Sequence, residues 1–308
     1  MLPNVQITNT VPALPDHEPL TLAHKNLVEE ALRQYPPESS ELTFTNLFAW
    51  RTTHPVLLTR IGESLWFYRN NPETKGALLP PVGPVRRGEL EQALDWVREI
   101  GGNPVFRYVP GRLAMLMHNI WPDLKLEPVR GDFDYLYHRR DLATLEGRKY
   151  DGKRNLVKQF HSGVQADYRR IDEEILPLCA DAQALWCDRK SCSDNPGLDA
   201  EDAAVNEILE HWNELTVFGG AYLVAGDVIG FAAAEELAPG TAVIHVEKGN
   251  TDYPGIYQAL NRKFCADELA QFEYVNREQD LGVPGLRKAK QSYHPIRFVE
   301  KYELKLDG

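Results

Sequence analysis

HVEKGNTDYPGIYQALNRKF, residues 245–264, and FEYVNREQDLGVPGLRKAKQSYHP, residues 272–295, decide the fold of this chain. The first stretch predicts a strand over 242–246, a glycine- and proline-containing turn, and a helix over 254–269. The second predicts a short strand over 272–276, a turn around Gly282, and a basic helix over 286–293. Strand, helix, strand and helix in this order indicate an α+β unit.

Polar and charged side chains gather directly after the second predicted strand. Residues two apart share a face of a strand, so Asn276, Glu278 and Asp280 are expected to point one way. Arg277 and Gln279 are then expected to point the other way. The pattern fits a functional site, and it fits equally well a solvated strand end followed by an ordinary amphipathic helix.

The same order of elements occurs twice along the chain. The first half predicts a helix over 20–35, an antiparallel meander over 56–79, a helix over 90–100, and strands over 105–109 and 134–137. The second half predicts a strand over 164–171, helices over 175–188 and 200–215 with a polar loop over 191–199 between them, a hairpin, and a last strand over 297–304. We therefore expect two α+β domains, 1–145 and 146–308, each with a mixed central sheet flanked by helices, and an active cleft in the second.

Length and charge set limits on function. A chain of 308 residues is longer than one hydrophobic core usually serves. The net charge of −11 argues against broad attraction to nucleic acid or to an anionic membrane, so a polyanionic partner would need a local basic patch. The sequence has no signal-peptide pattern and no apolar run near the roughly 20 residues of a membrane span. We expect a cytoplasmic protein without an integral membrane segment.

The cysteines do not suggest a disulfide framework. Cys179, Cys187, Cys192 and Cys265 are few and unevenly placed for a chain of this length. Two of them, with His211, could form a zinc site, but neither a CxxC nor an HxxxH spacing is present. We therefore expect no metal.

YLYHRRDLATLEGRKYDGKRNLVKQF, residues 135–160, adds a further signal. Together with the two opening stretches it resembles the family of the phosphatidylglycerol lysyltransferase C-terminal domain, most of all at LEGRKYDGKRN, YPGIYQALN and NREQDLGVPGLRKAKQSYHP. The resemblance covers nearly the whole chain. It implies a tandem duplication of a GNAT-like acyltransferase fold, akin to the Fem-type peptidoglycan aminoacyltransferases.

The resemblance also implies a reaction. Membrane-bound members of this family move a lysyl or alanyl group from aminoacyl-tRNA to a lipid headgroup. This sequence lacks their membrane-embedded portion, so a soluble acceptor is an equal alternative. The expected function is therefore aminoacyl-tRNA-dependent transfer of an amino acid to an unidentified acceptor, with no further cofactor.

Aminoacyl transfer needs a base for the acceptor, a polarised carbonyl and a proton for the leaving oxygen. Glu278 and Asp280 are the candidates for the base, or for orienting the donor's α-amino group. Tyr293 could donate a proton and His294 could shuttle one near neutral pH. The alternative for the two carboxylates is a structural salt bridge with a neighbouring arginine.

Binding of a phosphate-bearing donor would require cations despite the acidic total. The basic run over 148–158 and the basic helix supply them, although such runs are usually solvated helix faces. The candidate substrate-binding residues are Lys248, Asn250, Tyr253, Tyr257, Asn276, Arg277, Arg287, Lys288, Lys290, Arg148, Lys149 and Arg154.

Two other functions stay open. The first is acyl-CoA-dependent N-acyl transfer, in which the turn before the main helix of a GNAT enzyme holds a pyrophosphate with a Q/R-x-x-G-x-G/A motif. The corresponding turn, KGNTDYPGIY, lacks that spacing, Asp252 would repel a pyrophosphate, and Pro254 removes an N–H donor. The second is a noncatalytic protein that binds an amino acid or peptide.

Overall fold

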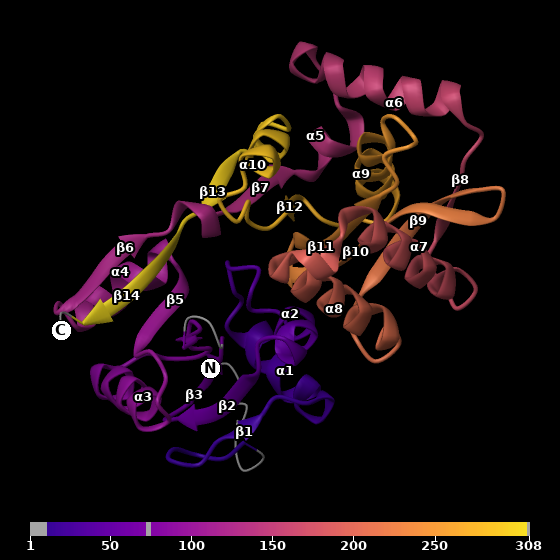
Figure 1. Ribbon diagram of the computed structural model, residues 1–308. Helices are drawn as coiled ribbons and strands as arrows, with labels where there is room; N and C mark the ends of the chain where they lie inside the picture. Colours follow the sequence, from indigo (N-terminus) through magenta and orange to yellow (C-terminus); the bar gives the residue numbers. More distant parts are fainter. Residues whose placement is uncertain (1–10, 72–74, 307–308) are drawn as a thin grey trace. The chain divides into compact units, whose positions relative to one another are not determined.

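The chain forms two compact units in the computed structural model, which describes residues 11–71 and 75–306 (Figure 1). Unit 1 combines the chain before Asp134 with the segment after Phe298, and unit 2 is Asp134–Phe298. Each unit contains one seven-stranded mixed sheet among the described residues.

Unit 1 has the strand order β1-β2-β3-β4-β5-β14-β6, in which β4 and β5 are parallel and the other pairs are antiparallel. Its strands are β1 (Glu18–Pro19), β2 (Val56–Ile61), β3 (Ser64–Arg69), β4 (Ala77–Leu78), β5 (Val105–Pro110), β6 (Leu124–Pro128) and β14 (Lys301–Leu306). Its helices are α1 (Lys25–Gln34), α2 (Phe44–Ala49), α3 (Arg87–Glu99) and α4 (Gly111–Ile120).

The last strand of the chain is fixed in unit 1 by a buried ion pair. Lys301 begins β14, and its Nζ lies 2.8 and 2.7 Å from the two carboxylate oxygens of Glu41. Both side chains are almost fully buried. Because a buried charge is costly without its partner, this pair ties β14 to the segment before α2.

Unit 2 has the strand order β13-β7-β12-β11-β10-β9-β8. Its strands are β7 (Asp134–His138), β8 (Asp167–Arg170), β9 (Phe218–Val224), β10 (Asp227–Ala238), β11 (Thr241–Gly249), β12 (Tyr274–Asn276) and β13 (Arg297–Val299). Its helices are α5 (Arg139–Thr144), α6 (Asp151–Gly163), α7 (Ile175–Lys190), α8 (Pro196–Glu210), α9 (Ile256–Asp267) and α10 (Pro284–Gln291). Strand β13 ends at Val299, the residue at which the chain returns to unit 1.

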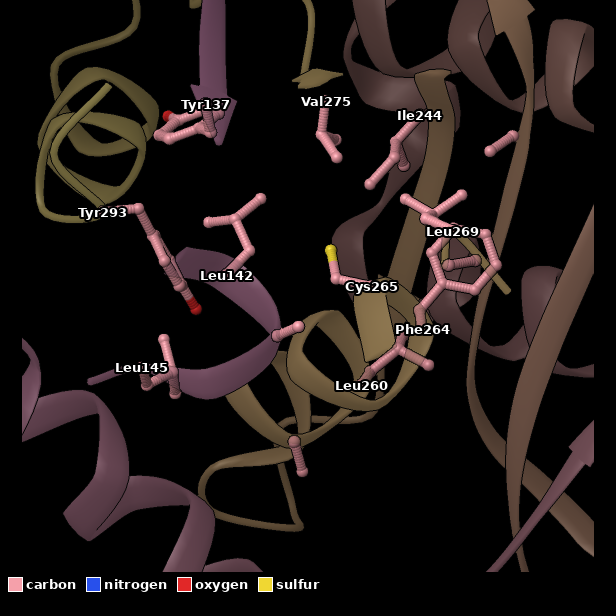
Figure 2. Packing of buried hydrophobic residues seen from close by; sticks show 14 of the residues in the cluster. Tyr137, Leu142, Leu145, Ile244, Leu260, Phe264, Cys265, Leu269, Val275 and Tyr293 are labelled. Atoms are coloured by element: carbon pink, nitrogen blue, oxygen red, sulfur yellow. The ribbon is translucent and has the colours of Figure 1, made fainter. Parts of the chain in front are cut away.

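The core of unit 2 forms around α9. Its buried face, including Leu260, Phe264 and Cys265, packs with residues of β11 and β12 such as Ile244 and Val275 (Figure 2). Helix α9 contacts β10 and β11, and α5 and α6 pack on α9. This packing fixes the ends of β11 and β12, where the polar residues of the second half gather.

Helix α6 approaches the N-terminus of α9 very closely. Gly255 caps α9 with φ of +90°, a conformation that glycine adopts readily. A Cβ at this position would lie 2.1 Å from the carbonyl oxygen of Leu156 in α6. The YPGIY sequence therefore keeps a glycine where two helix backbones meet.

Two predicted elements differ from the structure. The strand expected over 297–304 is two strands, β13 and β14, which belong to different sheets. The loop expected over 191–199 ends early, because Asn195 accepts hydrogen bonds from the N–H groups of Gly197 and Leu198 and Pro196 occupies the first turn of α8. An asparagine cap followed by proline is a favourable helix start.

The compact units also divide the chain differently from the predicted boundary at 145/146. Strand β7 pairs with β12, so the chain enters unit 2 at Asp134. Strand β14 pairs with β5 and β6, so the chain returns to unit 1. Element order along a sequence does not reveal such an exchange, because each strand is read with its nearest neighbours.

Cys187 and Cys192 are joined by a disulfide at the end of α7, which the sequence analysis did not expect. Cys179 and Cys265 are free and buried. The bond takes both sulfurs away from the zinc site that His211 could have completed. Among the described residues, no group of three or more His, Cys, Asp and Glu side chains could hold a metal ion.

Candidate functional site

The candidate site lies where strands β11 and β12 diverge. They pair in parallel only over Thr241–Val243 and Tyr274–Asn276. β11 then continues to Gly249, whereas the chain leaves β12 after Asn276. Polar side chains from the two strand ends bridge the diverging segments.

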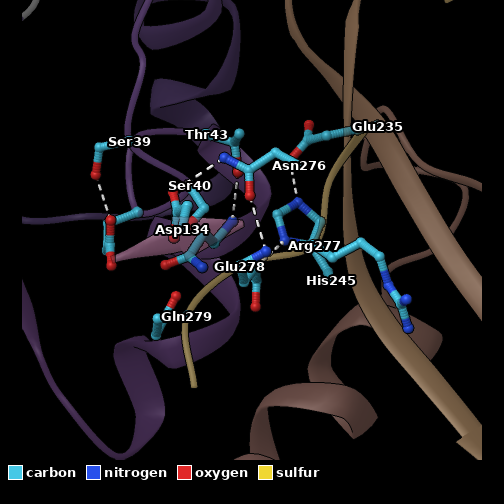
Figure 3. Close-up of polar contacts among 12 residues, drawn as sticks. Ser39, Ser40, Thr43, Asp134, Glu235, His245, Asn276, Arg277, Glu278 and Gln279 are labelled. Atoms are coloured by element: carbon cyan, nitrogen blue, oxygen red, sulfur yellow. Dashed lines mark hydrogen bonds and ion pairs between the residues drawn. The ribbon is translucent and has the colours of Figure 1, made fainter. Parts of the chain in front are cut away.

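The first bridge centres on His245. The pairing of β11 with β10 shifts register between Ile244 and Val246, which leaves His245 as the extra residue of a β-bulge. Its Nδ1 lies 2.8 Å from Oε1 of Glu278, and its Nε2 lies 2.7 Å from Oε1 of Glu235 on β10 (Figure 3). The imidazole is 4% exposed and the Glu235 side chain 6% exposed. The ring is thus enclosed between two carboxylates.

Glu278 adopts a backbone conformation that is unusual for its residue type. Its φ is +53°, its N–H donates to Oδ1 of Asn276 over 2.8 Å, and its carbonyl oxygen accepts from the N–H of Tyr135 over 3.2 Å. This turn ends the strand alternation predicted for 276–280. The Glu278 side chain keeps 21% exposure, and its Oε2 has no hydrogen-bond partner among the described residues.

The two carboxylates decide the charge of His245. Burial alone would disfavour the charged ring, but the hydrogen bonds to Glu235 and Glu278 and their negative charges outweigh it and raise the pKa of His245 to about 10. The ring is therefore an imidazolium at neutral pH, and each nitrogen donates to a carboxylate.

Asn276 supports the segment that carries Glu278 to His245. The residue is fully buried, and its Nδ2 donates to Oδ2 of the equally buried Asp134 over 3.0 Å. Its Oδ1 accepts from Glu278, so both ends of the amide are used. Asn276 thereby fixes the backbone that carries Glu278.

The second bridge joins Arg277 to Glu247 of β11. Nη2 of Arg277 lies 3.0 and 3.1 Å from the two oxygens of Glu247, and Nδ2 of Asn261 on α9 donates to the same carboxylate over 2.9 Å. Nη1 of Arg277 and Oδ1 of Asn261 are buried without a partner among the described residues. The guanidinium carbon also lies 4.7 Å from the ring centre of Tyr293.

Asp280 and Lys290 hold the segment after β12. Asp280 is fully buried, accepts from the hydroxyl of Tyr135 over 2.6 Å and pairs with Arg287 at 2.8 and 2.9 Å. Burial raises the pKa of Asp280, but these hydrogen bonds prevail and lower it to about 2. Nζ of Lys290 donates to the carbonyl oxygens of Arg277 and Gln279 over 2.5 Å each, and burial lowers its pKa to about 8.

Tyr293 and His294 lie at the end of α10 in different surroundings. The Tyr293 ring is buried between the guanidinium of Arg277 and Nζ of Lys153, which is 4.1 Å from the ring centre. Burial raises the pKa of Tyr293 well above its usual value, so its hydroxyl keeps its proton at neutral pH. His294 is exposed and packs edge-on against Tyr150.

Other predicted binding residues surround a second feature of unit 2. A cavity of about 120 Å³ is lined by α7, β10 and the end of β11, including Trp186, Lys248 and Asn250. Nζ of Lys248 lies 3.5 Å from the ring centre of Trp186 and 2.8 Å from Glu201. The hydroxyl of Tyr257 accepts from Nε1 of Trp186 over 3.3 Å. Tyr253 lies in the loop between β11 and α9, where it is partly buried and packs on the core of the unit.

The basic run is divided between structural and exposed cations. Arg154 donates to the carbonyl oxygens of Leu145 and Gly147, so it holds the turn before α6. Arg148, Lys149 and Lys288 are exposed. The structure therefore brings together Asn276, Arg277, Glu278, Asp280, Arg287, Lys290 and Tyr293. It places Lys248 and Asn250 in the wall of the cavity and Tyr257 against Trp186, and it leaves Arg148, Lys149 and Lys288 on the surface.

Four members of the site were not predicted from the sequence: Glu235, His245, Glu247 and Asn261. Glu235, His245 and Glu247 could have been noticed in the sequence. Charged residues are rare in strands as apolar as β10 and β11, and they usually have a partner there. Asn261 had no comparable signal, since one amide in a helix is common. No helix of the described residues is long and apolar enough to cross a bilayer.

The two mixed sheets with their flanking helices define a tandem GNAT-like acyltransferase fold. The crystal structure of FemX superposes with a TM-score of 0.57 over 94% of this chain and 96% of that chain, at 9% identity. A profile of the phosphatidylglycerol lysyltransferase C-terminal domain matches residues 32–305. The chain belongs to that family, as the resemblance of its motifs predicted.

Individual proteins are similar to this chain in sequence or in fold. A conserved protein of unknown function from Bacteroides thetaiotaomicron VPI-5482 is 29% identical, with a TM-score of 0.88 over 97% of this chain and 100% of that chain. The C-terminal domain of a protein assigned as a lysylphosphatidylglycerol synthetase from Agrobacterium fabrum is 14% identical, with a TM-score of 0.67 over 94% of this chain and 93% of that chain. An uncharacterized protein of Mycoplasmoides gallisepticum is 23% identical over 195 residues, which span 59% of this chain and 62% of that protein.

Proposed function

We propose that this acyltransferase-family protein takes its acyl group from an aminoacyl-tRNA and transfers it to an acceptor hydroxyl or amine, with Glu278 as the base. The observation that carries the proposal is the Glu278 carboxylate. One oxygen is held by His245, the other has no protein partner among the described residues, and the side chain as a whole keeps 21% exposure. A base needs this combination of fixed position and an oxygen that can reach the substrate proton.

The other groups around Glu278 fit roles in the same reaction. Arg277 is a largely buried cation beside Glu278 in the chain, so its positive charge can favour negative charge that develops on the oxygen of the reacting carbonyl. Asp280, Arg287 and Lys290 hold the backbone of this segment through the contacts described above. In this proposal they position Arg277 and Glu278, and Tyr293 covers the guanidinium.

The N-terminus of α9 favours this donor over acyl-CoA. In GNAT enzymes that use CoA, the N–H groups at this helix end receive the pyrophosphate. In this protein the backbone of α6 lies against Gly255 and presents the carbonyl oxygen of Leu156 there. A carbonyl oxygen repels phosphate oxygens, and Pro254 offers no N–H.

The surface of unit 2 offers cations for the phosphates of a tRNA. Arg148, Lys149 and Lys158 lie exposed at the start and on the outer face of α6, and Lys288 is exposed on α10. Their positive charge is local, whereas the chain as a whole has a net charge of −11. Binding through them should weaken steeply with salt. Because a tRNA donor occurs in the cytoplasm, we propose that compartment as well.

A second candidate function rests on the cavity beside Trp186. Its aromatic wall and the ammonium of Lys248 would suit a small ligand such as an amino acid, held without any transfer reaction. In that case ligand binding should be insensitive to substitution of Glu278.

The deciding experiment is incubation with a pool of radiolabelled aminoacyl-tRNAs, with cell extract as the source of acceptor. We expect label to leave the tRNA with the wild-type protein and to do so about 100-fold or more slowly with Glu278→Gln, as for loss of a general base. Glu236→Gln is the matched control, since Glu236 lies next to Glu235 on β10 but is exposed. If no label leaves any tRNA, or if CoA raises the melting temperature, the proposal is wrong.

A further inference from the structure

The geometry points to His245 as a positioning residue that, together with Glu235, fixes the Glu278 carboxylate for catalysis. The assignment of a task to Glu278 rests on the proposed function. The arrangement of the three side chains, which we call the clasp, does not, and it can be tested without a substrate.

With Glu235 and Glu278 both ionised, the hydrogen-bond chemistry of the clasp allows one charge state. Ionised carboxylates only accept hydrogen bonds, and a neutral imidazole has a single N–H. Both ring nitrogens of His245 lie within 2.8 Å of a carboxylate oxygen, so both must carry a proton. Glu235 and Glu278 are the charged groups that the described residues place against the ring, from β10 and from the segment after β12.

Two backbone irregularities bring these side chains together. The β-bulge at His245 turns the ring out of the regular alternation of β11, and the left-handed φ of Glu278 turns its carboxylate out of the line of β12. Strained non-glycine residues persist where the surrounding structure holds them, and they are frequent at functional sites. Here the β-bulge and the left-handed φ both serve the contact between His245 and Glu278.

The clasp gives each oxygen of Glu278 a separate task. Oε1 is held by the imidazolium, and Glu235 holds the far nitrogen so that the ring cannot rotate. Oε2 stays available for the acceptor. In the proposed transfer, Oε2 takes the acceptor's proton as the acceptor forms a bond to the acyl carbon, and returns that proton to the ribose oxygen as the ester bond breaks. His245 keeps both its protons throughout, so it positions the base and is not itself the base.

The charge state can be read from the imidazole nitrogens. The full-length protein, labelled with ¹⁵N-histidine, should show one of its nine histidines with both ring nitrogens protonated at pH 8.5. His245→Gln should remove that signal and so assign it. Glu235→Gln should return the ring to a neutral form at this pH, whereas the exposed control Glu236→Gln should leave it unchanged. A neutral His245 in the folded wild type at pH 8.5 would overturn the inference.

Kinetics test the positioning role. At metal sites, loss of the group that orients a ligand typically costs about 10- to 100-fold in activity. By analogy, His245→Gln should lower kcat by about that factor and leave KM within about twofold. Glu235→Gln, which keeps the shape of the side chain, should give a smaller loss in kcat alone. An unchanged kcat in a folded variant would refute positioning.

The two proposals fail separately. If no aminoacyl transfer is found but the imidazolium signal is present and depends on Glu235, the clasp stands and the proposed function falls. If transfer is found and depends on Glu278 while His245 is neutral, the function stands and the clasp falls. Circular dichroism of each variant shows whether it has folded. If His245→Gln does not fold, the Glu235→Gln spectra and rates decide.

Discussion

Glu247→Gln should destabilise unit 2 by removing the only charged partner that the described residues give Arg277. Nη2 of Arg277 lies about 3 Å from both oxygens of Glu247, and the two side chains are 12% and 13% exposed. Burial disfavours the guanidinium charge, but Glu247 raises the pKa of Arg277 above its usual value. Because a guanidinium is not deprotonated in proteins, Arg277 will stay charged after the substitution.

The expected loss of stability follows from the buried charge that Arg277 keeps. Breaking one side of a buried ion pair costs about 3–5 kcal/mol. We expect a loss near the lower limit, about 3 kcal/mol, because the new amide oxygen can still accept a hydrogen bond from Arg277. The contact from Asn261 on α9 to the same carboxylate weakens as well.

Hydrogen exchange read by mass spectrometry is the suitable assay, because it reports each unit separately. Peptides from β11 and α9 should exchange faster in Glu247→Gln, and those from unit 1 should not. Glu41→Gln is the matched control, since it breaks the buried pair with Lys301 and should act on β14 and its neighbours instead. A loss below about 1 kcal/mol in unit 2 would contradict the reasoning, because it would mean that water or another group compensates the charge.

Three further predictions concern unit 2. The pKa of Asp280 is lowered to about 2 from 3.8, so its contribution to stability is complete above about pH 4 and is lost as pH falls towards 2. Asp280→Asn should therefore reduce the dependence of the free energy of unfolding on pH in that range. Gly255→Ala should cost about 2 kcal/mol or more in thermal unfolding, since its Cβ would meet Leu156 at 2.1 Å, whereas Gly152→Ala on α6, with open space around it, should be neutral or slightly stabilising. Asn195→Ala should lower stability by about 1 kcal/mol through loss of the α8 cap, and an unchanged melting temperature would mean that water replaces the cap.

Long periodic elements were predictable from the sequence, and points of irregularity were not. Helix α9 appears near its predicted position, because its regularly spaced apolar residues pack in the core of unit 2. The start of α8 was misplaced, because Pro196 was taken as a loop signal when it fills a position that needs no N–H.

The site was predictable only where residues follow one another in the chain. Asn276, Arg277 and Glu278 are adjacent in sequence, so one polar segment revealed them. His245 and Glu235 meet them only through a bulge and the pairing of β10 with β11, which are products of tertiary structure. The face assigned to Glu278 by strand alternation did not apply, because its left-handed φ begins a turn directly after β12.

The position of β14 has a consequence for synthesis of the protein. This strand lies between β5 and β6 in the sheet of unit 1, yet it is synthesised after every other strand that the structure describes. Until then β5 and β6 expose unpaired edges and Glu41 lacks Lys301. Unit 2, whose strands β7 to β13 are continuous in the chain, can complete its sheet first. Unit 1, most of which is translated before unit 2, therefore completes its sheet last, and deletion of β14 should destabilise it.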